Sequence, residues 1–110
     1  MGDEDVKKTA VEITVEALKA SGVGVNRVLL FGSRARGDHD KDSDWDFLVV
    51  TDRKLNFGDK AEIVMHIKRK LAKLGIPNDV IVTDEATFER MKDCVGSVSS
   101  YAAREGVRIW

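Results

Sequence analysis

Five aspartates occupy every second position between residues 38 and 46, directly after a glycine–serine pair and two arginines. They are Asp38, Asp40, Asp42, Asp44 and Asp46 in the stretch FGSRARGDHDKDSDWDFLVV, residues 31–50. Carboxylates placed so close together repel one another, and a bound hard divalent cation offsets that repulsion. The spacing therefore indicates that some of the five could hold a metal ion.

A calcium loop of the helix-loop-helix kind is excluded by the same spacing. Such a loop needs glycine at its sixth position and a bidentate glutamate at its twelfth. The three possible frames, which begin at Asp38, Asp40 and Asp42, fail both requirements.

Strand geometry separates the last two aspartates from the first three. The segment WDFLVV, residues 45–50, is predicted to be a strand, in which successive side chains alternate between faces. Asp44 and Asp46 then project to one side, about 6.6 Å apart along the chain, while Trp45 turns to the other. Two carboxylates on one strand edge can share a divalent cation, whereas the three earlier aspartates are expected to be a solvated loop.

The loop before the aspartates carries groups that suit a phosphate. Gly32 ends the predicted strand 25–31 and allows the backbone to approach a ligand closely. Ser33 is expected to begin a short helical turn, whose exposed N–H groups favour an anion. Its hydroxyl and the two arginines add further donors. Phosphate donors on one loop and metal-binding acids on the next strand are what metal-assisted phosphoryl transfer requires.

The elements that must position these residues follow from the pattern of apolar residues. We predict helices over about 3–20, 59–74 and 98–104, strands over 25–31, 45–50 and 78–83, and a helix capped by Thr83. This order predicts an α/β (α+β) fold, a small mixed β-sheet flanked by helices, in one domain spanning residues 1–110.

The composition excludes several classes of protein. With 18 basic and 19 acidic residues the net charge is −1, which argues against a nucleic-acid coat or a membrane-surface protein. The single cysteine, Cys94, cannot form an intramolecular disulfide, and we find no secretory signal or membrane span. We therefore expect a cytoplasmic protein.

The spacing of the motif resembles that of a known superfamily. Gly32-Ser33, ten residues, then Asp44-Trp45-Asp46 is similar to the signature of the DNA polymerase β-like nucleotidyltransferases. The fuller wording, GSRARG followed by SDWDFLVV, resembles the minimal nucleotidyltransferases found beside HEPN-domain proteins. The resemblance implies the nucleotidyltransferase (polymerase β palm-like) fold and a third carboxylate on a later strand. Asp79 in NDVIVTDEATFER matches that acid by placement, although Asn78 replaces the usual apolar neighbour.

Roles for the acids and the loop follow from this resemblance. Asp44, Asp46 and Asp79 would be the catalytic, metal-binding residues, holding two Mg²⁺ ions, with Mn²⁺ as a possible substitute. Asp79 would also orient or deprotonate the attacking hydroxyl.

The resemblance assigns the nucleotide to the glycine–serine loop. Gly32 and Ser33 would grip the terminal phosphates of ATP or another nucleoside triphosphate, and Arg36 would support the loop or the leaving pyrophosphate. Arg34 is expected to be solvated.

Two functions stay open at this point. The first is transfer of AMP from ATP to a hydroxyl, as in related pairs in which a tyrosine of a HEPN-type toxin is modified by its antitoxin. The second is a non-catalytic module that binds a nucleotide and neutralises its partner by contact alone. Both imply a helical HEPN-domain partner, with no membrane and no nucleic acid, and both leave homo- or hetero-oligomers possible.

Overall fold

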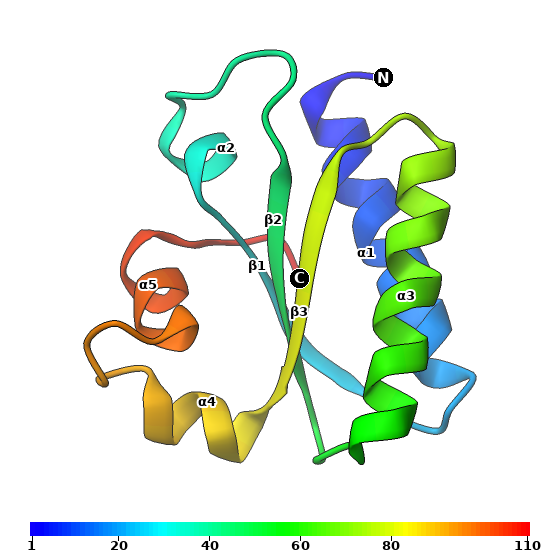
Figure 1. Ribbon diagram of the computed structural model, residues 1–110, viewed down its shortest axis with the longest axis vertical. Coiled ribbons are helices and arrows are strands. Elements are labelled where there is room, and N and C mark those ends of the chain that lie inside the picture. The colour runs from blue at the N-terminus through cyan, green and yellow to red at the C-terminus, as the bar shows by residue number, and fades with distance from the viewer.

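The computed structural model of the chain describes residues 1–110 and has one four-stranded sheet with helices on both faces (Figure 1). In chain order the elements are α1 (Asp3–Lys19), β1 (Val25–Phe31), α2 (Ser33–Arg36), β2 (Trp45–Thr51), α3 (Phe57–Lys73), β3 (Asn78–Asp84), α4 (Glu85–Met91), α5 (Val98–Glu105) and β4 (Val107–Arg108). Every predicted element is present, with small shifts at the ends. The mixed α/β fold is therefore confirmed.

The sheet has the order β3-β2-β1-β4 and mixes both strand directions. β1 runs antiparallel to β2 and to β4, while β2 and β3 are parallel and are joined by α3. The parallel register places Asp46 opposite Asp79 at one end and Thr51 opposite Asp84 at the other. These two ends of the β2–β3 pair carry the two sites described below.

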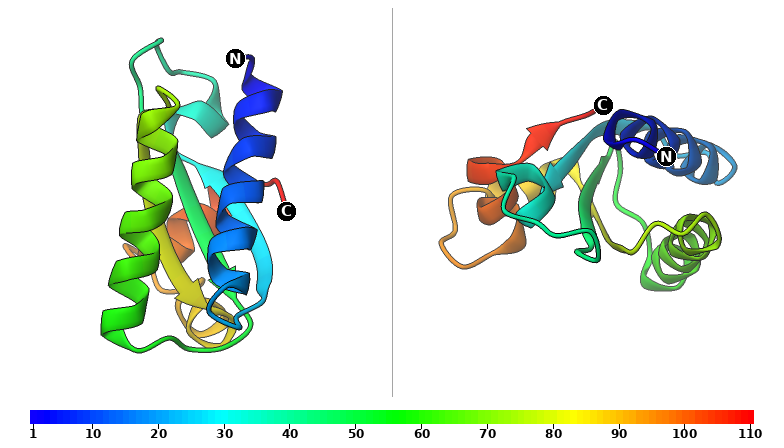
Figure 2. Two further views of the ribbon diagram at one scale, coloured as in Figure 1. Left: turned by 90° about the vertical axis from the view of Figure 1, so that its right-hand side faces the viewer. Right: turned by 90° about the horizontal axis from the view of Figure 1, so that it is seen from above.

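Side chains that alternate along the strands build a core on each face of the sheet. Trp45, Phe47 and Val49 of β2 point into the larger core, which α1 and α3 cover. Leu48 and Val50 point into the smaller core, which includes residues of α4 and α5. Figure 2 shows the two helical layers on opposite sides of the sheet. No helix of the chain is both long enough and apolar enough to cross a bilayer.

The cap of α4 differs from the prediction. β3 continues to Asp84, and the Asp84 carboxylate, not Thr83, accepts hydrogen bonds from the N–H of Thr87 at 3.0 Å and from its hydroxyl at 2.8 Å. Pairing with β2 keeps Thr83 inside the ladder, opposite Val50. The cap therefore moves one residue along the chain.

The short strand β4 was not predicted. It pairs with Leu29 and Leu30 of β1, and the pairing is extended by the carbonyl of Trp110, which accepts from the Val28 N–H at 3.2 Å. A strand of two residues is too short to show alternation in the sequence. Only contact with distant β1 defines it.

Candidate active site

Asp46 and Asp79 face the same side of the sheet at the amino ends of two parallel strands. They are register partners. Each lies two residues before an apolar side chain of the smaller core, Leu48 and Ile81 respectively, so both point to the face covered by α4 and α5. Asp46 is partly buried, whereas Asp79 is exposed, with 51% of its side chain accessible. Parallel pairing thus joins acids that lie 33 residues apart in the sequence.

Gly32 allows the Asp46 carboxylate to lie against the backbone at the end of β1. Asp46 pairs with Phe31 across β1 and β2, and Gly32 follows directly with a φ of 74° and a ψ of −159°, a conformation close to glycine-only. A Cβ atom at position 32 would lie 2.1 Å from Asp46 Oδ2. A larger residue there would have to displace the Asp46 carboxylate and would adopt a strained backbone, so the glycine of the motif suits the acid that follows it.

The surroundings of Asp46 favour its protonated form. Partial burial raises the pKa of this carboxyl above its ordinary value, and the negative charges of Asp79 and Asp44 raise it further. The Arg36 charge acts in the opposite direction but does not cancel these effects. A divalent cation beside Asp46 would offset the repulsion between these acids and favour the charged form of the Asp46 carboxyl.

Asp44 lies outside the strand. It precedes β2 and is exposed, although its charge reaches Asp46. No group of three Asp, Glu, His or Cys side chains in the structure is arranged to hold a metal ion. Asp79 instead lies 3.5 Å from the ammonium group of Lys68 on α3. The structure thus joins Asp46 and Asp79 as a pair, and a three-acid site stays a prediction.

Ser33 begins the short helix α2 beside this pair. The turn is closed by the N–H of Gly37, which donates to the Ser33 carbonyl at 2.9 Å, and Gly37 itself has a left-handed φ of 86°. The first N–H groups of any helix lack a partner within it, and those of Ser33 and Arg34 occupy these positions in α2. The predicted helical turn after Gly32 is confirmed.

Arg36 reaches from α2 to α5. Its guanidinium donates to Asp38 at 3.0 Å and to Glu105 at 3.1 Å, and it also contacts the Tyr101 hydroxyl. The Tyr101 ring packs edge-on against Phe31, with ring centroids 5.9 Å apart. Arg36 thereby ties the glycine–serine loop to α5. Tyr101 and Glu105 had no signal in the sequence, because they lie far along the chain from the motif.

Arg34 was predicted to be solvated, but in the structure it is partly buried and its side chain makes several contacts. Its guanidinium lies 4.7 Å from the centre of the Trp45 ring and donates to the carbonyls of Ser43 at 3.1 Å and Lys41 at 3.3 Å. These contacts fasten α2 to the end of the connection between α2 and β2, residues 37–44, which carries the first four aspartates. Because the partners are mostly backbone carbonyls, nothing in the residue types pointed to them.

The donors present fit a hard divalent cation. Mg²⁺ and Mn²⁺ prefer carboxylate oxygens, and here two carboxylates project from neighbouring strands to one face of the sheet, with that of Asp46 lying against Gly32. Asp38, Asp40 and Asp42 are exposed as predicted. They are therefore separate from this pair.

Most of the chain is similar to known proteins. Residues 11–108 match the family model described as the nucleotidyltransferase domain. A Methanocaldococcus jannaschii protein described as a candidate protein adenylyltransferase is 32% identical over 85 residues, which cover 76% of this chain and 80% of that protein.

Two solved structures share the fold at low identity. One is a toxin–antitoxin structure with AMP-PNP, which has a TM-score of 0.61 and 15% identity over 99% of this chain and 73% of that one. The other is a tri-AMPylated HEPN toxin in complex with its MNT antitoxin from Shewanella oneidensis. It has a TM-score of 0.57 and 13% identity over 96% of this chain and 69% of that one.

Proposed function

The chain belongs to the nucleotidyltransferase domain family, and on that premise we propose that it transfers AMP from ATP to a tyrosine hydroxyl of a HEPN-type toxin. The transfer depends on Mg²⁺ and makes this chain the antitoxin of the pair. The observation that carries the proposal is the Asp46–Asp79 pair beside the glycine–serine loop. Support for the acceptor and the nucleotide comes from the relative described as a candidate protein adenylyltransferase and from the AMP-PNP and tri-AMPylated complexes.

The loop binds the triphosphate. The Ser33 hydroxyl and the first N–H groups of α2 donate to phosphate oxygens, and Gly32 lets the backbone come close to them. Arg36, held by Asp38 and Glu105, keeps the loop against α5 and places a positive charge near the leaving pyrophosphate.

The acids hold the metal and the acceptor. Asp46 and Asp79 would supply carboxylate oxygens to the cation, and Asp44, which precedes β2, would be the third ligand. When bound, Mg²⁺ neutralises charge on the phosphate oxygens and lowers the pKa of the acceptor hydroxyl. Asp79, the more exposed of the pair, orients the hydroxyl and accepts its proton.

The reaction is an in-line substitution at the α-phosphorus atom. A bond forms between the tyrosine oxygen and the α-phosphorus, and the bond from that phosphorus to the oxygen bridging it to the β-phosphorus breaks. The products are an AMP-tyrosine ester, pyrophosphate and one proton.

An incubation with labelled ATP, Mg²⁺ and the helical partner tests this function. We expect label on a partner tyrosine with the wild type, and none with the double variant Asp44→Asn/Asp46→Asn. Asp42→Asn is the matched control, because Asp42 is an exposed acid of the same loop. If the double variant still neutralises the toxin as well as the wild type does, contact alone explains the antitoxin and the catalytic proposal is wrong.

Metal binding is tested without activity. Mg²⁺ should raise the melting temperature of the wild type more than that of Asp46→Asn, because at a given concentration a ligand stabilises the folded state more when it binds that state more tightly. An equal rise in both would remove Asp46 from the metal site.

A further inference from the structure

A pocket lies at the carboxyl ends of β2 and β3, at the opposite end of these strands from Asp46 and Asp79. It has a volume of about 260 Å³, and Thr51, Val82 and Thr83 form part of its lining. Figure 1 shows this end of the sheet at the bottom, between the start of α3 and α4. The family motif lies at the other end and assigns nothing to this pocket.

Three cations from three segments line the pocket. Lys54 comes from the connection after β2, Lys60 from the first turns of α3 and Arg90 from α4. The ion pairs of the structure all involve other residues. Isolated surface lysines and arginines are usually just solvated. Here the three share one recess, and Lys60 is half-buried.

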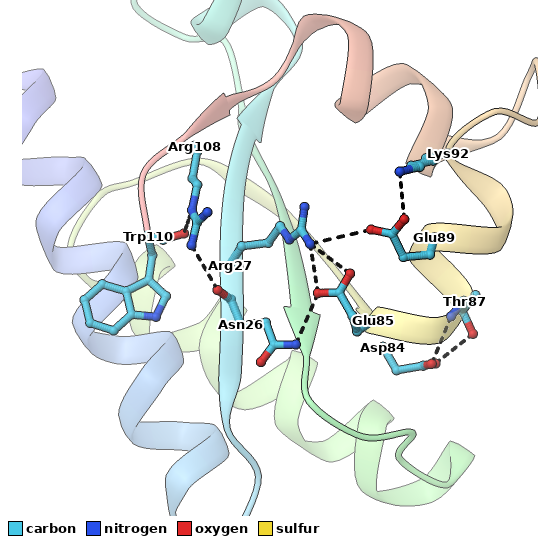
Figure 3. Close-up of polar contacts among 9 residues, drawn as sticks. All are labelled: Asn26, Arg27, Asp84, Glu85, Thr87, Glu89, Lys92, Arg108 and Trp110. Atoms are coloured by element: carbon cyan, nitrogen blue, oxygen red, sulfur yellow. Dashed lines mark hydrogen bonds and ion pairs between the residues drawn. The ribbon is translucent and has the colours of Figure 1, made fainter.

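The acids near this recess are engaged elsewhere. Asp84, the only acid in the lining, caps α4 through Thr87, while Glu85 and Glu89 bind Arg27 and Lys92 (Figure 3). Asp59, at the start of α3, accepts from Asn56 at 2.9 Å. Three cations against one carboxylate leave the lining with an excess of two positive charges.

The size and the neighbouring helix restrict what could bind. The volume lies below the range of about 300–1,000 Å³ typical of pockets for drug-sized ligands. The 17-residue helix α3 begins beside the pocket, and the positive end of its dipole adds to the potential there. A small anion fits both constraints.

We propose that this pocket binds a phosphate group, either inorganic phosphate or a small phosphomonoester. Arg90 can hold two phosphate oxygens at once, and Lys54 and Lys60 act as point charges on the others. The site is separate from the Asp46–Asp79 pair, so it does not depend on the transfer reaction proposed above.

A titration monitored by backbone amide NMR tests the proposal. Inorganic phosphate is added at constant ionic strength, and glycerol 3-phosphate in a parallel series tells free phosphate from the ester. We expect shifts concentrated in residues 51–60 and 83–90. In Lys60→Gln/Arg90→Gln the dissociation constant should rise at least about tenfold, because two of the three cations are lost.

The matched control removes the same charges elsewhere. Lys8→Gln/Arg69→Gln changes one exposed lysine and one exposed arginine outside the pocket, and it should bind as the wild type does. The spectrum of each variant also reports whether it is folded. Equal weakening in the two double variants, or shifts confined to the Gly32–Ser33 loop, would overturn the proposal.

Discussion

The two ends of the parallel β2–β3 pair carry opposite charges and are built in different ways. At the amino ends the acids belong to the strands themselves, so the ladder sets the spacing of Asp46 and Asp79. At the carboxyl ends the cations Lys54, Lys60 and Arg90 come from a connection and two helices. The first arrangement is rigid and suits a metal ion that demands fixed ligands. The second uses long, flexible side chains and suits an anion with several equivalent oxygens.

The carboxylates at the two ends also differ in their protonation. Burial and neighbouring acids raise the pKa of Asp46. Burial acts in the same direction on Asp84, but the hydrogen bonds from Thr87 and the charge of Lys54 outweigh it and lower the pKa of that carboxyl. The charged form of an aspartate is therefore disfavoured at one end and favoured at the other. The difference lies in its hydrogen-bond donors and in the charges around it.

The largest expected effect separates the two ends by activity. Asp46→Asn should lower the rate of AMP transfer on the order of 1,000-fold, because it removes a carboxylate that we propose binds the metal at the reacting centre. Lys60→Gln/Arg90→Gln should leave the rate within about threefold of the wild type, because a contact at the far end adds little to transition-state stabilisation. Steady-state rates with labelled ATP check both. Comparable losses in the two variants would show that the ends are coupled.

The next effect concerns the glycine under Asp46. Gly32→Ala should destabilise the fold by about 2–3 kcal/mol and displace the Asp46 carboxylate, because the new Cβ atom meets Oδ2 in a backbone conformation that alanine avoids. Gly37→Ala is the control, since Gly37 also has a positive φ but nothing lies within 4 Å of its Cβ position. It should lose only about 1 kcal/mol and keep its activity. Urea denaturation and the transfer assay measure the two quantities. Equal losses of stability and activity in both variants would contradict the contact with Asp46.

A smaller effect tests the N-terminal cap of α4, which lies at the carboxyl ends of β2 and β3. Asp84→Ala should lower the free energy of unfolding by about 1 kcal/mol, because the first turn of α4 loses its acceptor. Thr83→Ala should change it by less than about 0.5 kcal/mol. Asp84→Asn keeps a capping oxygen but removes the negative charge, so it should bind phosphate more tightly than the wild type. Unchanged phosphate affinity in that variant would argue that Asp84 does not face the anion.

The smallest effect is the pH dependence of stability, which should have opposite signs at the two ends. Folded Asp46 has a raised pKa, so the wild type loses stability as the pH rises from the ordinary aspartate value through the folded one. In EDTA, the stability of Asp46→Asn relative to that of the wild type should therefore increase as the pH increases.

Folded Asp84 has a lowered pKa, so its contribution to stability is complete above the ordinary aspartate pKa and is lost as the pH falls through the pKa of the folded state. The stability of Asp84→Asn relative to that of the wild type should accordingly decrease as the pH increases. Melting curves between acidic and neutral pH compare the variants, and parallel curves would refute both assignments.

The acidic end could be predicted in large part because its signals are local. Gly32, Ser33 and Asp46 lie in one stretch, and the alternation of WDFLVV already assigned Asp46 and Trp45 to opposite faces. Asp79 needed the resemblance to a family as well, since residue types alone do not say which strand lies beside β2. Strand alternation also placed Asp44 with Asp46, but the strand begins at Trp45 and leaves Asp44 exposed.

Other features had no local signal. The contacts of Arg34 are with backbone carbonyls and the Trp45 ring, and those of Arg36 are with α5 at the other end of the chain. The basic pocket collects single cations from three separate segments, none of which has an unusual composition.

The sequence by itself determined the helices and the three long strands, the glycine–serine turn and the alternation that faces Asp46 away from the larger core. These depend on neighbours within a few residues, where backbone geometry and side-chain type suffice. Tertiary structure alone decided that Asp79 lies opposite Asp46, that β4 exists, and that Lys54, Lys60 and Arg90 share a recess. Each of these depends on the register between distant segments, which is set by the packing of the whole core around the sheet.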